Sequence, residues 1–255
     1  MKEPSLEPPK AGAFPVCDIL GLPYFGGSAA SAIEIALEKM EKRETFTVFT
    51  PGATVAARAA KDESLAALLR TADMLLPDGS GTLLAARLCG GALCERIAGI
   101  DFAEALFALS EGMSPRIFFY GARQGVAERA AANLRRQYPG IVFACADGYG
   151  DDPALRIARF QPHAVCVCLG AEKQERWIAA HKDAVGGVCI GLGGSFDVFA
   201  GVVPRAPRLW QKAGLEWAYR TLREPKRIPR LFPLPAYYAK CLRARWAKRP
   251  KPTRK

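Results

Sequence analysis

The chain has 255 residues, half of them hydrophobic, and a formal net charge of +11, so it is long and apolar enough to bury a full globular core. It contains no run of 18 apolar residues, and its first residues lack the apolar core of a signal peptide, so we expect a cytoplasmic protein. Its eight cysteines lie mostly in apolar runs without a CxxC pair, and only two histidines are present; we expect buried free thiols rather than disulfides or a zinc site.

Strand-like and helix-like stretches alternate between residues 46 and 201. The strand-like stretches are short, continuous and rich in Val, Ile, Phe and Cys, as expected where both faces of a strand are covered; they span 46–50, 73–77, 116–121, 141–146, 164–170 and 188–194. The helix-like stretches between them span 54–71, 82–89, 102–111, 126–138, 153–160 and 173–181. This alternation predicts the α/β class, with an open, mostly parallel, Rossmann-like sheet and helices on both faces.

From residue 204 the composition changes to a mixture of prolines, aromatic residues and basic side chains. Between residues 220 and 255, thirteen Lys and Arg face a single acid, Glu224, so this segment carries +12 and residues 1–219 together carry −1. We predict two units: an α/β domain over residues 1–207 and a basic, aromatic-rich appendage over residues 208–255. The appendage is expected to form one or two helices and to end in a disordered tip.

Candidate site residues follow the predicted strands, because ligands of open parallel sheets bind where strands end and loops lead into helices. Four such loops carry glycines or polar residues, and we expect them to line one cleft: 50–52, 77–81, 170–175 and 191–197. Asp78 stands between a proline and a glycine in the second loop. Asp before Gly is common in turns and Asp caps helices, so a turn residue and a catalytic carboxylate both fit this position.

The loop 191–197 follows a predicted strand, and its candidates for ligand contact are Gly193, Gly194, Ser195 and Asp197. Bare backbone amides at such a place can approach a phosphate, but a tight turn into a helix explains the same pattern. The loop is not the dinucleotide-binding fingerprint, because Phe196 stands where that motif needs a glycine.

Other candidates are charged or polar residues that fit two interpretations. Lys173, Gln174 and Glu175 begin a predicted helix, where they can contact substrate or form a solvated charged face. Arg96 is equally ambiguous. The chain contains no P-loop, no G-x-S-x-G elbow and no HExxH motif.

Eight segments spread over most of the chain carry a family resemblance: DILGLP (18–23), FTPGATV (49–55), ADMLLPDGSGTLLAARL (72–88), ERIAGIDF (95–102), FFYGARQGVAERAAANLRRQYPG (118–140), LGAEKQERWI (169–178), IGLGGSFDVFAGVVPRAP (190–207) and GLEWAYRTLREPKR (214–227). Taken in this order, they resemble the WecG/TagA/CpsF family of bacterial glycosyltransferases (glycosyltransferase family 26). The resemblance implies transfer of a sugar, often N-acetylmannosamine, from a UDP-sugar to a polyprenyl-diphosphate-linked N-acetylglucosamine in teichoic-acid or related glycan synthesis.

The resemblance also assigns roles to residues. It places the general base on Asp78, a second catalytic residue on Thr50, the active-site arginine on Arg96, and the family's K-Q-E segment on the residues 173–175. Two positions depart from the family pattern: Gly52 replaces the usual Asn, and Glu172 replaces the usual Pro. Both departures can mark a different donor sugar.

The expected reaction inverts the anomeric carbon, so one carboxylate must take the acceptor's proton. No Asp-x-Asp motif for a metal-bound diphosphate occurs in the chain, so we expect metal-independent catalysis without a cofactor. Positive side chains then have to meet the charge of the departing UDP, and the candidates are Arg96 with Arg220, Arg223, Arg227 and Arg230 of the appendage.

Partners follow from the same features. The appendage's basic and aromatic side chains suit an anionic membrane surface, so we expect a peripheral protein on the inner face of the plasma membrane. The resemblance further implies a homo-oligomer. Nucleic acid is not an expected partner.

Two other classes of protein compete with this interpretation. A nucleic-acid-binding protein explains the basic appendage but gives no purpose to Asp78, Gln174 or the glycines of the loop 191–197. A nucleotide-dependent oxidoreductase fits the Rossmann-like fold, although the broken fingerprint at Phe196 argues against it.

Overall fold

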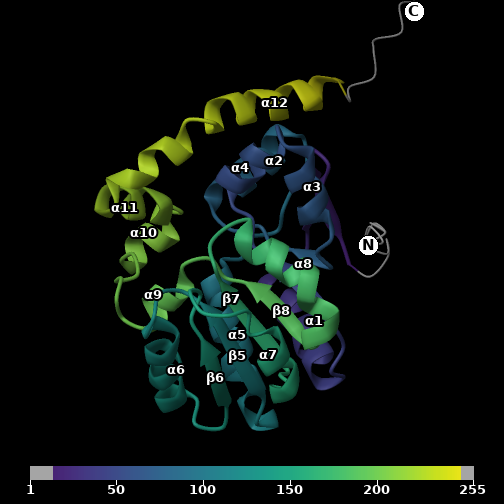
Figure 1. The fold of residues 1–255 in the computed structure, drawn as a ribbon. Coiled ribbons are helices and arrows are strands. Elements are labelled where there is room, and N and C mark those ends of the chain that lie inside the picture. The colour runs from purple at the N-terminus through teal and green to yellow at the C-terminus, as the bar shows by residue number, and fades with distance from the viewer. Residues whose placement is uncertain (1–13, 248–255) are drawn as a thin grey trace, which may run out of the picture.

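The computed structural model describes residues 14–247, which contain one eight-stranded sheet in the order β1-β2-β4-β3-β8-β7-β5-β6 (Figure 1). The first two strands pair antiparallel and every other neighbouring pair is parallel. The predicted open, mostly parallel α/β sheet is therefore confirmed. The strands are β1 Val16–Ile19, β2 Leu22–Phe25, β3 Phe46–Phe49, β4 Met74–Leu75, β5 Arg116–Gly121, β6 Val142–Ala146, β7 Ala164–Cys168 and β8 Val188–Gly191.

Helices cover both faces of the sheet, as predicted. They are α1 Ala29–Glu41, α2 Ala53–Ala59, α3 Glu63–Arg70, α4 Ser80–Leu88, α5 Gly99–Ser110, α6 Val126–Gln137, α7 Ala154–Phe160, α8 Lys173–Val185 and α9 Ser195–Phe199, with a 3-10 turn η1 at Glu111–Met113. One hydrophobic core lies under α1, α5, α6 and α9, and the other lies under α2, α3, α4, α7 and α8. Neighbouring strand residues such as Phe118 and Phe119 enter opposite cores, which explains the continuous apolar sequence of each strand.

The order of the strands places a crevice between β3 and β8. These two strands are parallel neighbours, but the helix after β3, α2, packs into one core and the helix after β8, α9, packs into the other. Such a switch point, where helices leave adjacent strands toward opposite faces, is where open α/β sheets bind ligands. The loops 50–52 and 191–197 flank this crevice.

The structure differs from the prediction in three places. The β1–β2 hairpin and α1 precede the first predicted strand. The predicted helix 54–71 is two helices: α2 ends at Ala59 with Ala60 as its C-cap, and Asp62 caps α3 by accepting a hydrogen bond from the Leu65 backbone N–H at 3.1 Å. The predicted strand 73–77 is reduced to the two residues of β4.

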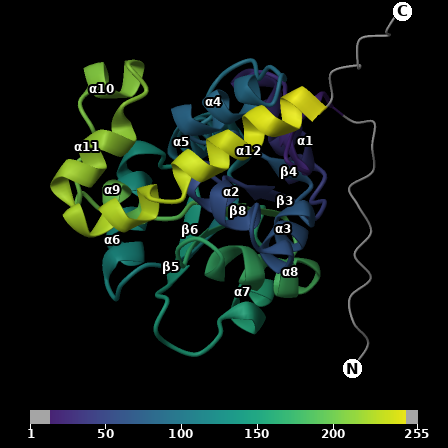
Figure 2. The ribbon, with the colours of Figure 1, turned by 90° about the horizontal axis from the view of Figure 1, so that it is seen from above.

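The appendage contains more helix than predicted. It forms α10 Arg208–Lys212, α11 Glu216–Arg223, the 3-10 helix η2 Pro225–Leu231 and α12 Leu234–Ala247. Figures 1 and 2 show α12 lying across α2 and α4, where it buries Tyr237 and Cys241. The predicted disordered tip falls at the end of the appendage, where residues 248–255 lie outside the described residues. No helix within residues 14–247 has the length and apolarity needed to cross a membrane.

The eight cysteines are free thiols, as predicted. Six are buried, Cys145 is half-buried and Cys94 is exposed. Burial raises the pKa of buried thiols such as Cys189, to about 12, so they act as small apolar core residues.

Gly121, at the end of β5, provides a test of how tightly the sheet is packed. Its φ is +115°, and a Cβ there would lie 2.5 Å from the carbonyl oxygen of Cys168 on β7. Gly125 also has a positive φ, +77°, but a Cβ there would meet nothing within 4 Å. We expect Gly125→Ala to lower the free energy of unfolding by about 1–2 kcal/mol through its backbone conformation, and Gly121→Ala to cost about 1–3 kcal/mol more through overpacking. Urea unfolding measures both variants; equal losses would contradict the argument.

Candidate active site

The four predicted loops meet at one pocket of about 690 Å³ at the β3–β8 crevice. The appendage closes this pocket with residues from α11, η2 and α12. Eleven of the fourteen predicted site residues line it: Thr50, Asp78, Arg96, Gln174, Glu175, Gly193, Gly194, Ser195, Arg220, Arg227 and Arg230. Lys173, Asp197 and Arg223 do not. The prediction of a shared cleft is confirmed.

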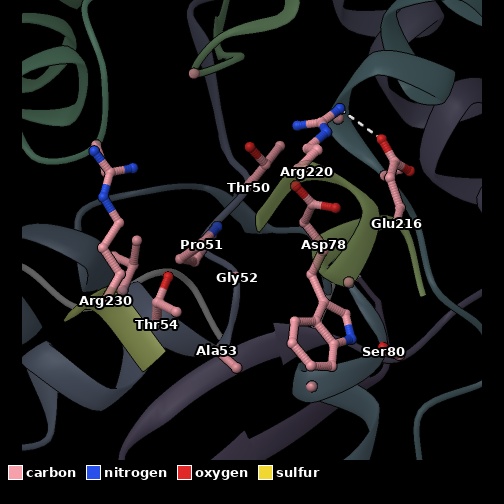
Figure 3. A pocket seen from close by; sticks show the side chains of 18 of the residues that line it. Thr50, Pro51, Gly52, Ala53, Thr54, Asp78, Ser80, Glu216, Arg220 and Arg230 are labelled. Atoms are coloured by element: carbon pink, nitrogen blue, oxygen red, sulfur yellow. Dashed lines mark hydrogen bonds and ion pairs between the residues drawn. The ribbon is translucent and has the colours of Figure 1, made fainter. Parts of the chain in front are cut away.

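Asp78 is held in the pocket by its backbone. Its N–H donates to the carbonyl of Leu76 at 2.9 Å, and its carbonyl accepts from the Thr82 hydroxyl at 2.9 Å. The N-cap of α4 is Gly79, with a φ of +85° and without a side-chain capping bond, so Asp78 does not cap the helix. Its carboxylate accepts no hydrogen bond from residues 14–247 and points into the pocket beside Arg220 and Thr50 (Figure 3).

The surroundings of Asp78 make it a weak acid. Burial raises the pKa of its carboxyl to about 6, while the nearby guanidiniums of Arg220 and Arg96 oppose this rise and the carboxylates of Glu216 and Asp101 add to it. A carboxyl group with a pKa near 6 is ionised at neutral pH and is still a competent proton acceptor.

Thr50 spans the crevice. Its hydroxyl donates to the carbonyl of Gly191 at 2.8 Å, which joins the end of β3 to the end of β8. With its proton engaged there, the Thr50 oxygen can only accept a hydrogen bond from a ligand. A Cβ on Gly99 would lie 3.1 Å from the Thr50 methyl group, so the small residue at the start of α5 lets this side chain fit.

Gln174 and Glu175 are buried at the base of the pocket. The Gln174 side chain donates to Glu175 Oε1 at 2.8 Å and accepts from the Gly193 backbone N–H at 2.9 Å, so it ties α8 to the loop after β8. Glu175 also completes a capping box with Glu172. The alternative of a solvated charged face is wrong for Gln174 and Glu175, whereas Lys173 is exposed.

The loop after β8 presents its backbone to the pocket through Gly193 and Gly194. Gly193 has a φ of +61°, and a Cβ there would meet nothing within 4 Å, so the turn needs glycine for its conformation. Ser195 is buried and donates to the carbonyl of Leu192 at 2.8 Å. Asp197 does not line the pocket, and its Oδ1 lies 3.5 Å from Arg123 Nη2.

Arginines supply the positive charge of the pocket. Arg96 comes from the body, and Arg220, Arg227 and Arg230 come from the appendage. Arg227 is paired with Glu224 at 2.9 Å, whereas no carboxylate of residues 14–247 pairs with Arg230. Arg223 lies over the ring of Tyr219, 5.5 Å from its centroid, and outside the pocket.

Several pocket residues were not among the predicted candidates. The most polar is Glu216, a buried carboxylate that contacts Arg220 at 2.5 Å and Arg96 at 3.4 Å. Trp217 and Tyr238 also line the pocket, and the Ser80 hydroxyl donates to the carbonyl of Gly214 at 2.6 Å. Glu216 and Trp217 lie in the segment 214–227, which carries part of the family resemblance. That resemblance could have pointed to them as site residues. Among residues 14–247, no group of three or more His, Cys, Asp and Glu side chains is arranged to hold a metal ion.

Comparison with known proteins agrees with this geometry. The sequence profile described as the Glycosyl transferase WecG/TagA/CpsF family matches residues 17–251. The N-acetylglucosaminyldiphosphoundecaprenol N-acetyl-beta-D-mannosaminyltransferase of Bacillus subtilis (strain 168) is 36% identical over 226 residues, which cover 86% of this chain and 88% of that protein. Proteins of the same name from Bacillus spizizenii and Staphylococcus aureus (strain MW2) are 37% identical over 209 residues and 32% identical over 235 residues. These matches cover 80% and 89% of this chain and 81% and 92% of the two relatives.

The two alternative classes, an oxidoreductase and a nucleic-acid-binding protein, have no support from these comparisons. The profile match spans both the α/β body and most of the appendage. The chain belongs to the WecG/TagA/CpsF family and is a glycosyltransferase.

Proposed function

We propose that the protein is an inverting transferase that moves an N-acetylmannosamine-type or related hexose from a UDP-sugar to N-acetylglucosamine on a polyprenyl diphosphate, in the synthesis of a teichoic-acid-type or other cell-surface polysaccharide. The names of the relatives support the acceptor and the sugar class. The observation that carries the proposal is the Asp78 carboxylate, which is free of hydrogen bonds from residues 14–247 in a pocket that also holds four arginines.

Asp78 acts as the general base in this proposal. The acceptor hydroxyl oxygen forms a bond to the anomeric carbon, the bond from that carbon to the UDP oxygen breaks, and Asp78 takes the hydroxyl proton. The raised pKa supports this role, because a base works best when its pKa lies near the working pH. Thr50 accepts a hydrogen bond from the sugar beside it.

The diphosphate of departing UDP gains negative charge, which preorganised donors must stabilise. Arg96, Arg220, Arg227 and Arg230 supply guanidiniums, whose fork of N–H groups matches phosphate oxygens. The backbone N–H of Gly194 is available in the same pocket, whereas that of Gly193 already donates to Gln174. With these cations in place, we propose that the reaction needs no metal ion and no cofactor.

The choice of donor sugar depends on Gly52. The backbone does not require glycine there, because its φ is −71°, and a Cβ would meet only the Asp78 carbonyl oxygen, at the ordinary contact distance of 3.4 Å. Glycine therefore leaves room beside the base that the family's usual Asn would fill. Glu172, the other departure, pairs with Arg58 and Arg176 outside the pocket, so the basis of a changed preference lies at Gly52.

The appendage binds the inner face of the plasma membrane in this proposal. Half of the exposed large apolar side chains of residues 14–247 belong to it, including Leu209, Leu222, Phe232 and Trp246 with 65–80% of their surface exposed. Basic residues alternate with them along the sequence, and each can add about 1 kcal/mol of attraction to an anionic leaflet. Self-association of the protein stays a prediction.

Replacing Asp78 by Asn tests the general base. We expect kcat to fall by about 10²- to 10⁴-fold, while calorimetry detects UDP binding as in the wild type. Stability should not fall at neutral pH, because a buried carboxylate with a raised pKa is less favourable when ionised in the folded protein than in the unfolded chain. Retained turnover would remove Asp78 from this role.

The pH dependence tests the same assignment independently. The base must be ionised to accept a proton, so kcat/KM of the wild type should rise with pH through a pKa of about 6 and decline below it. An initial-rate profile between pH 5 and 8, measured with UDP-sugar and a prenyl-diphosphate-linked N-acetylglucosamine, records this limb. A rate that is flat across pH 6 contradicts the assignment.

Chelation tests the absence of a metal requirement. With excess EDTA we expect the initial rate of transfer to be unchanged, because the arginines meet the charge of the leaving group. A loss of activity that magnesium or manganese restores would show that the arginines alone are insufficient.

Paired surface variants test the membrane face. We expect Phe232→Ser with Trp246→Ser to reduce co-sedimentation with vesicles of phosphatidylglycerol and phosphatidylcholine, since each large apolar side chain contributes about 1.5–3 kcal/mol when buried. The matched control is Leu155→Ser with Tyr149→Ser, which removes side chains of similar exposure from the α/β body. Equal binding of both variants, or stronger binding to single-stranded RNA than to vesicles, contradicts a membrane role.

A further inference from the structure

Glu216 is a buried acid inside a strongly basic appendage. It is the first residue of α11 and only 7% exposed. Its Oε1 lies 2.5 Å from Arg220 Nη2, one turn along the same helix, and its Oε2 lies 3.4 Å from Arg96 Nη1 of the α/β body. Both oxygens are thus engaged by guanidiniums, as a buried charge requires. The mechanism proposed above uses the two arginines but gives Glu216 no task.

The contacts of Glu216 fix the positions of both arginines. Arg96 lies between Glu216 and Asp101, whose Oδ2 is 3.7 Å from Arg96 Nη2, and Asp101 is itself paired with Arg205. Free arginine side chains carry about 2 kcal/mol of rotamer entropy. Holding them before substrate arrives lowers the cost of binding and orienting a diphosphate.

The same two arginines also face the general base. The charged and titratable groups that act on Asp78 are Tyr24, Arg96, Asp101, Glu216 and Arg220. Because the Asp78 carboxylate accepts no hydrogen bond from residues 14–247, it is open to ion pairing with a guanidinium that can move. Such a pair would stabilise the ionised carboxylate, lower its pKa and weaken it as a base. Figure 3 shows Glu216 and Asp78 beside Arg220, with Glu216 connected to it by a dashed line.

We propose that Glu216 is a positioning residue that holds Arg96 and Arg220 toward the diphosphate and keeps them from pairing with Asp78. The inference rests on the proposed function, in which Asp78 is the base. A simple clamp that attaches the appendage to the body is the competing explanation, and the two differ in their effect on the basicity of Asp78.

The test replaces Glu216 by Gln, which keeps the shape of the side chain and removes its charge. We expect the acidic limb of kcat/KM to move about one pH unit lower, because Asp78 loses a like charge and gains access to two guanidiniums. We also expect a lower plateau, because the base is weaker, and weaker UDP binding, because Arg96 and Arg220 are no longer held toward the diphosphate. If Glu216 acts only as a clamp, the rate should fall by the same factor at every pH, and the acidic limb of kcat/KM should stay at its wild-type position.

Two further variants serve as controls. Glu216→Asp retains the charge, so its limb should stay at the wild-type position even where its rate is lower. Glu63→Gln removes a carboxylate that pairs with Arg70 at 2.8 Å on α3, outside the pocket, and should leave both limb and plateau unchanged. Urea unfolding of each variant separates lost rate from lost folding, and Glu216→Ala, which also removes the charge, gives the test if the Gln variant does not fold.

A carbon-13 NMR titration of the Asp78 carboxyl separates this inference from the proposed function, because it needs no substrate. A lower pKa of Asp78 in Glu216→Gln than in the wild type supports the positioning role even if no donor sugar is found. An unchanged pKa in the folded variant overturns it even if the wild type is an active transferase.

Discussion

The site depends on one topological constraint, the placement of β3 and β8 as parallel neighbours whose following helices leave toward opposite faces. Crossovers between parallel strands are right-handed. Helices can therefore cover both faces of the sheet only if the order of the strands reverses at some point. At that point the loops that follow the two neighbouring strands, here β3 and β8, diverge. The hydroxyl of Thr50 joins the two strand ends across this point by its 2.8 Å bond to Gly191. The loops that follow these two strands line the pocket together with Asp78 after β4 and Gln174 on α8.

The pocket could be predicted from the sequence to the extent that it follows from strand ends. Asp78, Thr50 and Gly193 come directly after apolar runs, and the parallel sheet brings the carboxyl ends of those runs to one edge. The β1–β2 hairpin was not predicted, although its strands are as long as β3 and β8, with four residues each. Its turn has positive φ values at Leu20 and Gly21. An Asn-Gly pair would have predicted such a turn from the sequence, but a Leu-Gly pair does not.

Side-chain direction was the part that sequence could not give. Lys173, Gln174 and Glu175 are adjacent and polar, yet the first is exposed and the other two are buried, because Gln174 binds the Gly193 N–H and Glu175 closes a capping box. Arg223 occupies the same face of α11 as Glu216 by helical periodicity. It lies nearly two turns farther along the helix, where it stacks over the Tyr219 ring and does not line the pocket.

The net charge of the sequence predicted a basic appendage correctly, but it did not predict the electrostatic environment of Asp78. A segment charge of +12 between residues 220 and 255 suggests that any nearby carboxylate is held strongly ionised. At Asp78 the opposite holds, because burial outweighs the arginines and Glu216 and Asp101 offset part of their charge. The appendage can therefore present positive charge to a diphosphate without lowering the pKa of Asp78 so far that it no longer accepts a proton. Glu216 contributes to this division, because it is a buried acid paired with two of the arginines.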